Sequence, residues 1–136
     1  MAQIDLTSVT ETPQQASGTT FTLQLPASGT YAVGDVLMGF ITNNGGGTTI
    51  AENSAFGWSV VAGQANTTNV RTAVVYKKAA STSESNPVFN CASGTISGLS
   101  WRIFDVDATT QIDASALATA GSATSVTSSA PDSDTD

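Results

Sequence analysis

The sequence contains no histidine, and Cys91 is the only cysteine among its 136 residues. These absences exclude Ser-His-Asp and Cys-His nucleophile pairs, His-ligated zinc or iron sites, and a disulfide within the chain. Because an unpaired cysteine commonly behaves as a small apolar residue, we predict that Cys91 is buried. Because the common catalytic and metal-binding sites are excluded in this way, we expect no enzyme activity, no cofactor and no bound metal.

Basic residues are also scarce, since four Lys and Arg stand against 11 Asp and Glu, for a net charge of -7. Binding to phosphate requires clustered Lys and Arg, so we do not expect a nucleic-acid partner. No run of about 18 apolar residues is present to cross a membrane. The N-terminus lacks the basic and apolar regions of a secretory signal, so we expect neither membrane insertion nor export by a signal peptide.

Small polar residues take the place of charge, with 17 Ser, 21 Thr, seven Asn and 12 Gly. Thr favours strands, and Gly and Asn favour turns, so this composition is typical of β structure. The hydrophobic fraction of 40% with low charge indicates a folded chain. We predict one domain over residues 1–130 and an acidic C-terminal tail over residues 131–136.

Apolar residues alternate with polar ones in several short segments bounded by turn residues. Phe21, Leu23 and Leu25 share one face of such a segment, and residues 36–41 are apolar on both faces, which indicates a central core strand. We expect strands at residues 4–9, 20–25, 36–41, 56–61, 70–77, 87–91, 99–106 and 124–127. A polar turn is expected at residues 14–18, and an Ala-rich segment at 112–120 permits a short helix.

About eight short antiparallel strands at this spacing predict an all-β domain of the β-sandwich or jelly-roll type. Pro87 indicates that residues 87–91 form an edge strand. We also expect Trp58 in the interior, and Trp101 beside Leu99 and Ile103 on an inward face.

Two groups of carboxylates could carry chemistry. Asp105, Asp107 and Asp113 could share a calcium ion, but they lack the spacing of a known calcium loop, and we interpret them as a solvent-facing strand end. A glycosidase needs two facing carboxylates, for which Glu11, Glu52 and Glu84 are available, but nothing in their spacing favours it.

Four motifs occur in a fixed order along the chain. Gly34-Asp35 precedes the apolar residues 36–41, Gly57-Trp58 opens a strand, and residues 72–77 alternate and end in Tyr-Lys. Residues 101–107 then precede Ile-Asp-Ala-Ser at 112–115. In this order, over residues 19–130, the chain resembles a loose family of β-sandwich modules in bacteriophage virion proteins.

The resemblance implies a structural protein of the virion, assembled in the host cytoplasm, with no catalytic residues. It implies a head decoration or cement protein that binds and stabilises the outer lattice of the capsid, with a tail, tail-tip or fibre module as the alternative. The implied partners are the major capsid protein or neighbouring virion proteins. It also implies a homo-oligomer, with a trimer favoured because similar decoration proteins sit at local three-fold axes.

The chain departs from this family at its end, where a further apolar strand is replaced by acidic residues. Either the sequence is cut short, or another subunit covers the exposed edge of the sheet. We therefore expect subunit or capsid contacts in the N-terminal strand, in the Asn- and Gly-rich loop and in the acidic tail. The candidate contact residues are Gln3, Ile4, Asp5, Asn43, Asn44, Gly45, Gly46, Asp134 and Asp136.

A carbohydrate-binding or receptor-binding module is a second interpretation. Aromatic rings stack on the apolar faces of sugars, and a phenol can keep its hydroxyl group in water. Tyr31 and Tyr76, together with the loop at 43–47, are the candidate glycan contacts in that case.

Overall fold

The computed structural model describes residues 2–45, 49–66 and 70–105, with the backbone alone for residues 61–66. Within these residues the protein is all-β, and it contains no helix. The strands are β1 (Gln3–Thr22), β2 (Val36–Asn43), β3 (Ala51–Glu52), β4 (Ser59–Asn66), β5 (Val70–Lys78) and β6 (Val88–Phe104). No helix of the described part is long and apolar enough to cross a membrane.

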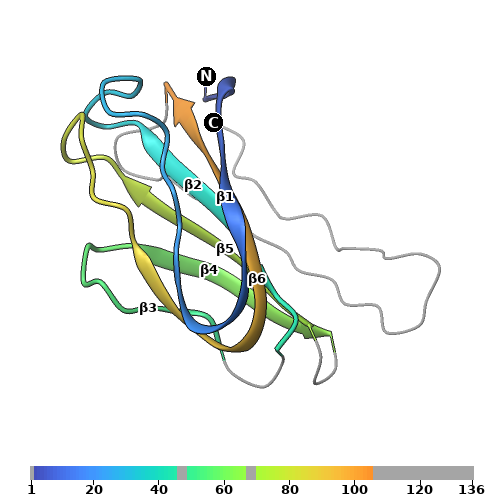
Figure 1. Cartoon of the computed structure of the whole chain (residues 1–136). Helices are drawn as coiled ribbons and strands as arrows, with labels where there is room; N and C mark the ends of the chain where they lie inside the picture. Colours follow the sequence, from blue (N-terminus) through green and yellow to red (C-terminus); the bar gives the residue numbers. More distant parts are fainter. Residues whose placement is uncertain (1, 46–48, 67–69, 106–136) are drawn as a thin grey trace, which may run out of the picture.

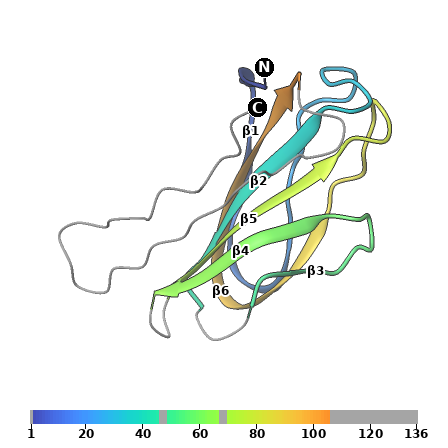
Figure 2. The same ribbon diagram turned by 180° about the vertical axis from the view of Figure 1, so that it is seen from behind.

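The six strands form one antiparallel sheet in the order β1-β6-β2-β5-β4, and β3 pairs with β6 beside this path. β1 and β6 are much longer than the other strands and bend back on themselves, as Figures 1 and 2 show. Their pairing runs from Gln3 opposite Phe104 to Thr22 opposite Val88, with register shifts on the way. The bend brings the C-terminal end of β1 and the first residues of β6, together with β3, over one face of β2 and β5 (Figure 1). We call this the inner face.

The hydrophobic core lies between these two parts of the sheet. Leu37 and Ile41 of β2 and Ala73 and Val75 of β5 face it from one side. The other side supplies larger residues, which are Phe21, Leu23, Ile50, Trp58 and Phe89. The Trp58 and Phe89 rings meet edge to face with centroids 6.4 Å apart.

Two glycines of the sheet make room for Leu23. A Cβ atom on Gly39 would lie 2.5 Å from Leu23 Cδ2, and one on Gly98 would lie 3.1 Å from Leu23 Cδ1 and 2.9 Å from Phe21 Cε1. Any larger residue at either position would overlap these side chains. The inner face of β2 and β6 is therefore built from small residues where the Phe21–Leu23 segment packs on it.

This packing reverses the expected orientation of the last strong strand. Ile96 and Ser100 of β6 are buried on the core side, and the Ser100 hydroxyl donates to the Gln24 carbonyl at 2.6 Å. Leu99, Trp101 and Ile103 alternate with them and lie half-buried on the opposite face, so the prediction that these three point inward is wrong. Phe21 and Leu23 fill the space on the core side of β6. Only small residues fit on that face of β6 beside them, and these residues are Gly98 and Ser100. The burial predicted for Trp58 and Cys91 is confirmed.

Two predictions for segments next to prolines are wrong, namely the polar turn at residues 14–18 and the edge strand at residues 87–91. Pro13 lies inside β1, between the paired residues Thr12 and Gln15 where the register shifts, and no turn forms at residues 14–18. The missing N–H of a proline is tolerated there because β1 is an outer strand of the sheet and the pairing is irregular. Pro87 immediately precedes β6, whose first residues pair with both β1 and β3 and are not at an edge.

The prediction of a central strand at residues 36–41 is confirmed, because β2 lies between β6 and β5 in the centre of the sheet. In β5, Val70, Thr72, Val74 and Tyr76 share the face opposite to the buried Ala73 and Val75. The expected strand at 124–127, the helix at 112–120 and the acidic tail at 131–136 lie outside the described residues.

Candidate functional site

The N-terminal part of β1 forms one outer edge of the described sheet, and it contains three of the predicted contact residues. Gln3 and Ile4 are exposed, and Asp5 is half-buried. All three pair with the end of β6, with Asp5 opposite Arg102. The structure therefore brings Gln3, Ile4 and Asp5 together at a sheet edge.

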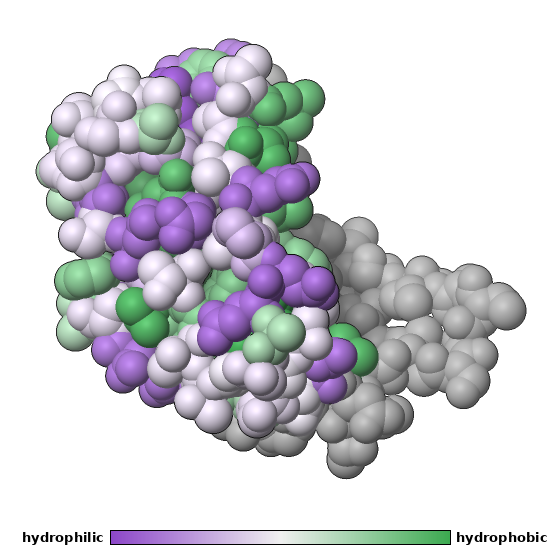
Figure 3. All heavy atoms as spheres, viewed as in Figure 1, coloured by the Kyte–Doolittle hydropathy of each residue, from purple (hydrophilic) through white to green (hydrophobic). Residues whose placement is uncertain are grey.

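A bulge follows directly in β1. Asp5 is opposite Arg102 and Thr10 is opposite Ser100, so four residues of β1 stand against one of β6. Leu6 is 78% exposed and Val9 is 44% exposed, beside Ile4 at 58%. Figure 3 shows apolar surface next to this part of β1, whereas most of the same face is white or purple. A bulge that turns large apolar side chains toward solvent is typical of a contact site.

Polar side chains hold the bulge in place. Asp5 Oδ1 accepts from the Thr7 N–H at 3.0 Å and from the Thr7 hydroxyl at 2.6 Å. Ser8 Oγ donates to the Asp5 carbonyl and accepts from the Arg102 N–H at 2.8 Å. The Ser8 hydroxyl thus replaces the backbone partner that Arg102 loses at the bulge.

Arg102 joins the bulge to the turn before β2. Its Nε lies 2.7 Å from Asp35 Oδ2, and its Nη1 donates to the Thr30 carbonyl at 3.1 Å. Nη1 also lies 3.6 Å from Asp5 Oδ2, and the guanidinium stacks on the Phe104 ring. Asp35 Oδ2 in turn accepts from the Ala32 N–H, which fixes the turn.

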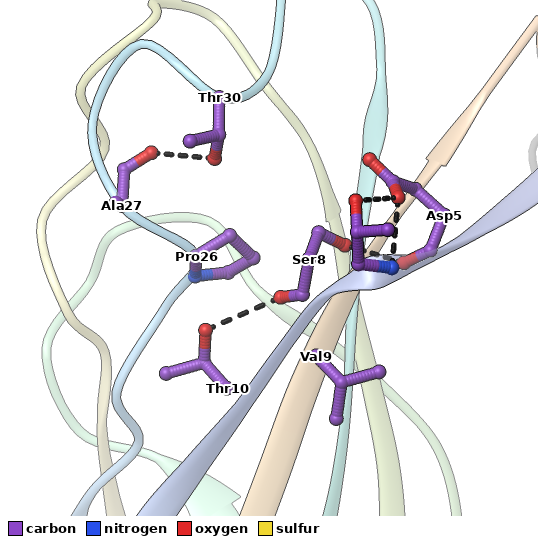
Figure 4. Close-up of a pocket in the computed structure, with 8 residues that line it drawn as sticks. Asp5, Ser8, Val9, Thr10, Pro26, Ala27 and Thr30 are labelled. Carbon is purple, nitrogen blue, oxygen red and sulfur yellow. Dashed lines mark hydrogen bonds between the residues drawn. The ribbon is translucent and has the colours of Figure 1, made fainter.

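A pocket opens between the bulge and the loop at residues 26–30, as Figure 4 shows. Its volume is about 200 Å³. It is lined by Asp5, Thr7, Ser8, Val9, Thr10, Pro26, Ala27 and Thr30. In Figure 4, Pro26 faces Ser8 and Thr10 across the pocket. A cavity of this size suits one long side chain more than a drug-sized molecule.

The Asp5 carboxyl at this pocket is ionised at neutral pH. The hydrogen bond from the Thr7 hydroxyl lowers its pKa, burial raises it by less, and the Thr7 N–H and Arg102 lower it further. The pKa therefore lies below its ordinary value of 3.8.

The Asn- and Gly-rich loop is tied to β6. Asn43 is only 1% exposed, with its Nδ2 donating to the Ala92 carbonyl and its Oδ1 accepting from the Gly45 N–H. Asn44 is exposed and exchanges two hydrogen bonds with Thr95, and Gly45 lies against Gly94. The prediction that Asn43 makes a surface contact is therefore wrong, because its amide group is buried and bonds to backbone groups. Gly46, like Asp134 and Asp136, lies outside the described residues.

The two candidate glycan-binding tyrosines do not meet. Tyr31 is 3% exposed in the core, where its hydroxyl accepts from the Glu84 N–H at 2.6 Å. Tyr76 lies half-buried on the opposite face of the sheet, across from Met38. The predicted shallow site formed by Tyr31 and Tyr76 is therefore wrong.

Of the three glutamates considered for a glycosidase, Glu11 is exposed on β1 and the other two have local partners. Glu52 accepts from the N–H groups of Phe56 and Trp58, and Glu84 from Lys77 and from two N–H groups of its loop. Burial raises the pKa of the Cys91 thiol above its ordinary value, and a hydrogen bond from Asn43 lowers it by less. In the described ranges no three acidic or cysteine side chains gather to hold a metal, and of the three aspartates considered for calcium only Asp105 lies within them.

Leu6, Ser8, Val9 and Thr10 are parts of this site that were not among the candidate contact residues, although the first three lie in the N-terminal strand in which contacts were expected. A sequence signal for the bulge was present, since Asp5, Thr7 and Ser8 are residues whose short polar side chains bond to nearby backbone and compete with regular strand pairing.

Comparisons with protein-family models, with curated proteins and with solved structures find no match to this chain. The geometry of the β1 edge is thus the basis for a functional proposal.

Proposed function

We propose that the protein is a structural β-sandwich module of a phage particle, a head decoration protein that docks on the capsid through the edge of β1. The observation that carries the proposal is the bulge of β1, which exposes Leu6 and Val9 beside Ile4. The order of sequence motifs that resembles virion modules supplies the class of partner.

An edge strand with exposed apolar residues is a hazard for a protein that stays alone. Such edges pair with other chains unless they are covered, and soluble proteins normally protect them with charge or irregular pairing. Here the bulge interrupts regular strand pairing, but the side chains of Ile4 and Leu6 remain exposed to solvent. This combination favours a surface that a specific partner covers.

Binding to capsids tests the proposal directly. We expect the purified protein to sediment with heads of the phage that encodes it, and Leu6→Ser to weaken this binding about tenfold, as for an apolar anchor at an interface. Phe56→Ser is the matched control, because Phe56 is also an exposed apolar residue, 41% exposed, in the loop between β3 and β4. Its binding should equal that of the wild type.

The same experiment with separated heads and tails decides between the two virion locations. Sedimentation with tails alone supports the tail-module alternative. Failure to bind either particle, or equal losses in Leu6→Ser and Phe56→Ser, would contradict docking through β1.

A further inference from the structure

The pocket beside the β1 bulge has no hydroxyl proton left to offer. Thr7 donates its hydroxyl proton to Asp5 Oδ1, and Ser8 donates to the Asp5 carbonyl. Thr10 donates to the Ser8 carbonyl, and Thr30 to the Ala27 carbonyl (Figure 4). Each hydroxyl has one proton, so these four oxygens can only accept further hydrogen bonds.

The pocket also carries a negative charge that is only partly compensated. Arg102 is shared between two carboxylates and makes its short contact, 2.7 Å, with Asp35. Its distance to Asp5 Oδ2 is 3.6 Å, which is beyond hydrogen-bond range. One guanidinium against two carboxylates leaves a net charge of about -1 on this group, and Asp5 is the member of the group that lines the pocket.

The walls between these acceptors are apolar. Pro26 and Ala27 line the pocket from the loop, and Val9 lines it from the bulge. A ligand that fits must combine an aliphatic stem with a compact group of hydrogen-bond donors and a positive charge. A lysine side chain has this combination, with three donors and no acceptor on a flexible four-carbon stem.

A second copy of this chain is poorly suited to supply that lysine. Lys77 is bonded to Glu84 at 2.6 Å, and Lys78 also has an interaction partner. The other two basic residues are Arg102, engaged as described, and Arg71, which is half-buried beside β4. With a net charge of -7, the chain complements a basic partner better than it complements itself.

We propose that this pocket binds a lysine side chain of a different protein, in a segment that lies along the β1 bulge. This inference rests on the proposed function, because it specifies the chemistry of the partner that covers the β1 edge. Residues that flank the lysine would contact Leu6 and Val9, so we expect them to be apolar.

Titration with tripeptides, followed by amide chemical shifts of the ¹⁵N-labelled protein, tests the pocket without a capsid. The probes are acetyl-Val-Lys-Val-amide and the same peptide with norleucine, which keeps the stem and loses the charge. We expect saturable shifts at residues 5–10 and 26–30 with the lysine peptide, and about fivefold weaker binding of the norleucine peptide. Equal binding of the two peptides, or shifts elsewhere, would overturn the proposal.

Two variants remove the same charge from different places on β1. Asp5→Asn should weaken the lysine peptide about fivefold, whereas Glu11→Gln should leave its affinity unchanged, because Glu11 is exposed and does not line the pocket. Equal losses would show a general charge effect and contradict the pocket. If Leu6→Ser weakens capsid binding while neither peptide binds, the lysine inference fails and the proposed function stands. If the peptides behave as expected and the protein binds no capsid, the proposed function fails and the lysine site stands.

Discussion

Glu84 shows how single carboxylates hold the loops of this protein. Its carboxylate lies 2.6 Å from Lys77 Nζ and accepts from the N–H groups of Ala80 and Ser81 at 2.6 and 3.0 Å. Burial raises the pKa of the Glu84 carboxyl, and the hydrogen bonds from Lys77, Ala80 and Ser81 lower it by more. The net effect is a pKa below the ordinary value of 4.5.

We expect Glu84→Gln to lower the free energy of unfolding by about 2 kcal/mol at pH 7, because three hydrogen bonds lose a charged acceptor. A depressed pKa in the folded state gives stability that is present above pH 4.5 and is lost as the pH falls through the folded value. The difference between wild type and Glu84→Gln, measured by urea unfolding from pH 7 to pH 3, should therefore shrink below about pH 4.5.

Glu11→Gln serves as the control for this series, since Glu11 is exposed on β1. It should change the free energy of unfolding by less than about 0.5 kcal/mol at each pH. A difference between wild type and Glu84→Gln that grows toward low pH would contradict the assigned role of Glu84.

Among the elements, β2 and β6 depend on small residues that face the core. Gly39 lies opposite Val75 of β5 and Ser100 of β6, and Leu23, which directly follows β1, packs over it. The close approach explains why two central strands carry glycine, which ordinarily weakens a strand.

Gly39→Ala should destabilise the protein by about 2 kcal/mol, because the new Cβ would lie 2.5 Å from Leu23 Cδ2 and 3.0 Å from Val75 Cγ2. Leu23→Ala alone should cost about 3 kcal/mol through the cavity that it leaves. The double variant should cost clearly less than the sum, because the shortened side chain makes room for the new methyl group. Additive losses in urea unfolding would mean that the two residues do not compete for the same space.

The strand segments were predictable where local pattern and tertiary packing agree. Apolar residues on both faces of 36–41 predict a central strand, and β2 is central. The pattern failed at Trp101, because the choice of inner face in β6 depends on Phe21 and Leu23, which are distant in sequence. Of the candidate site, the sequence indicated Gln3, Ile4 and Asp5, but the bulge depends on the register against β6, which alternation alone does not reveal.

At the scale of the whole molecule, the described sheet ends at β1 on one side and at β4 on the other. The bulge and the pocket are both on β1, so the proposed capsid contact uses one of these two edges. The rest of the molecule remains available for contacts among copies. Most oligomers of one chain are closed and symmetric, and we propose a trimer for this chain.

Light scattering over a range of concentrations should give a mass three times the chain mass of 13.7 kDa. Leu6→Ser should leave that mass unchanged, because we propose that the β1 edge contacts the capsid and not another copy of the chain. A wild-type monomer throughout the range would contradict the trimer. Dissociation caused by Leu6→Ser would instead assign the β1 edge to contacts among the copies.

The position of β6 in the sheet has a consequence for synthesis. This strand is the last one described along the chain, yet it pairs with β1, β2 and β3. Before Val88–Phe104 has left the ribosome, β2, β4 and β5 are the only described strands that can pair with one another as they do in the final sheet. The N-terminal strand must therefore wait for most of the chain, and such distant pairing makes folding slow and leaves Ile4 and Leu6 open to chaperones and to other nascent chains during that interval.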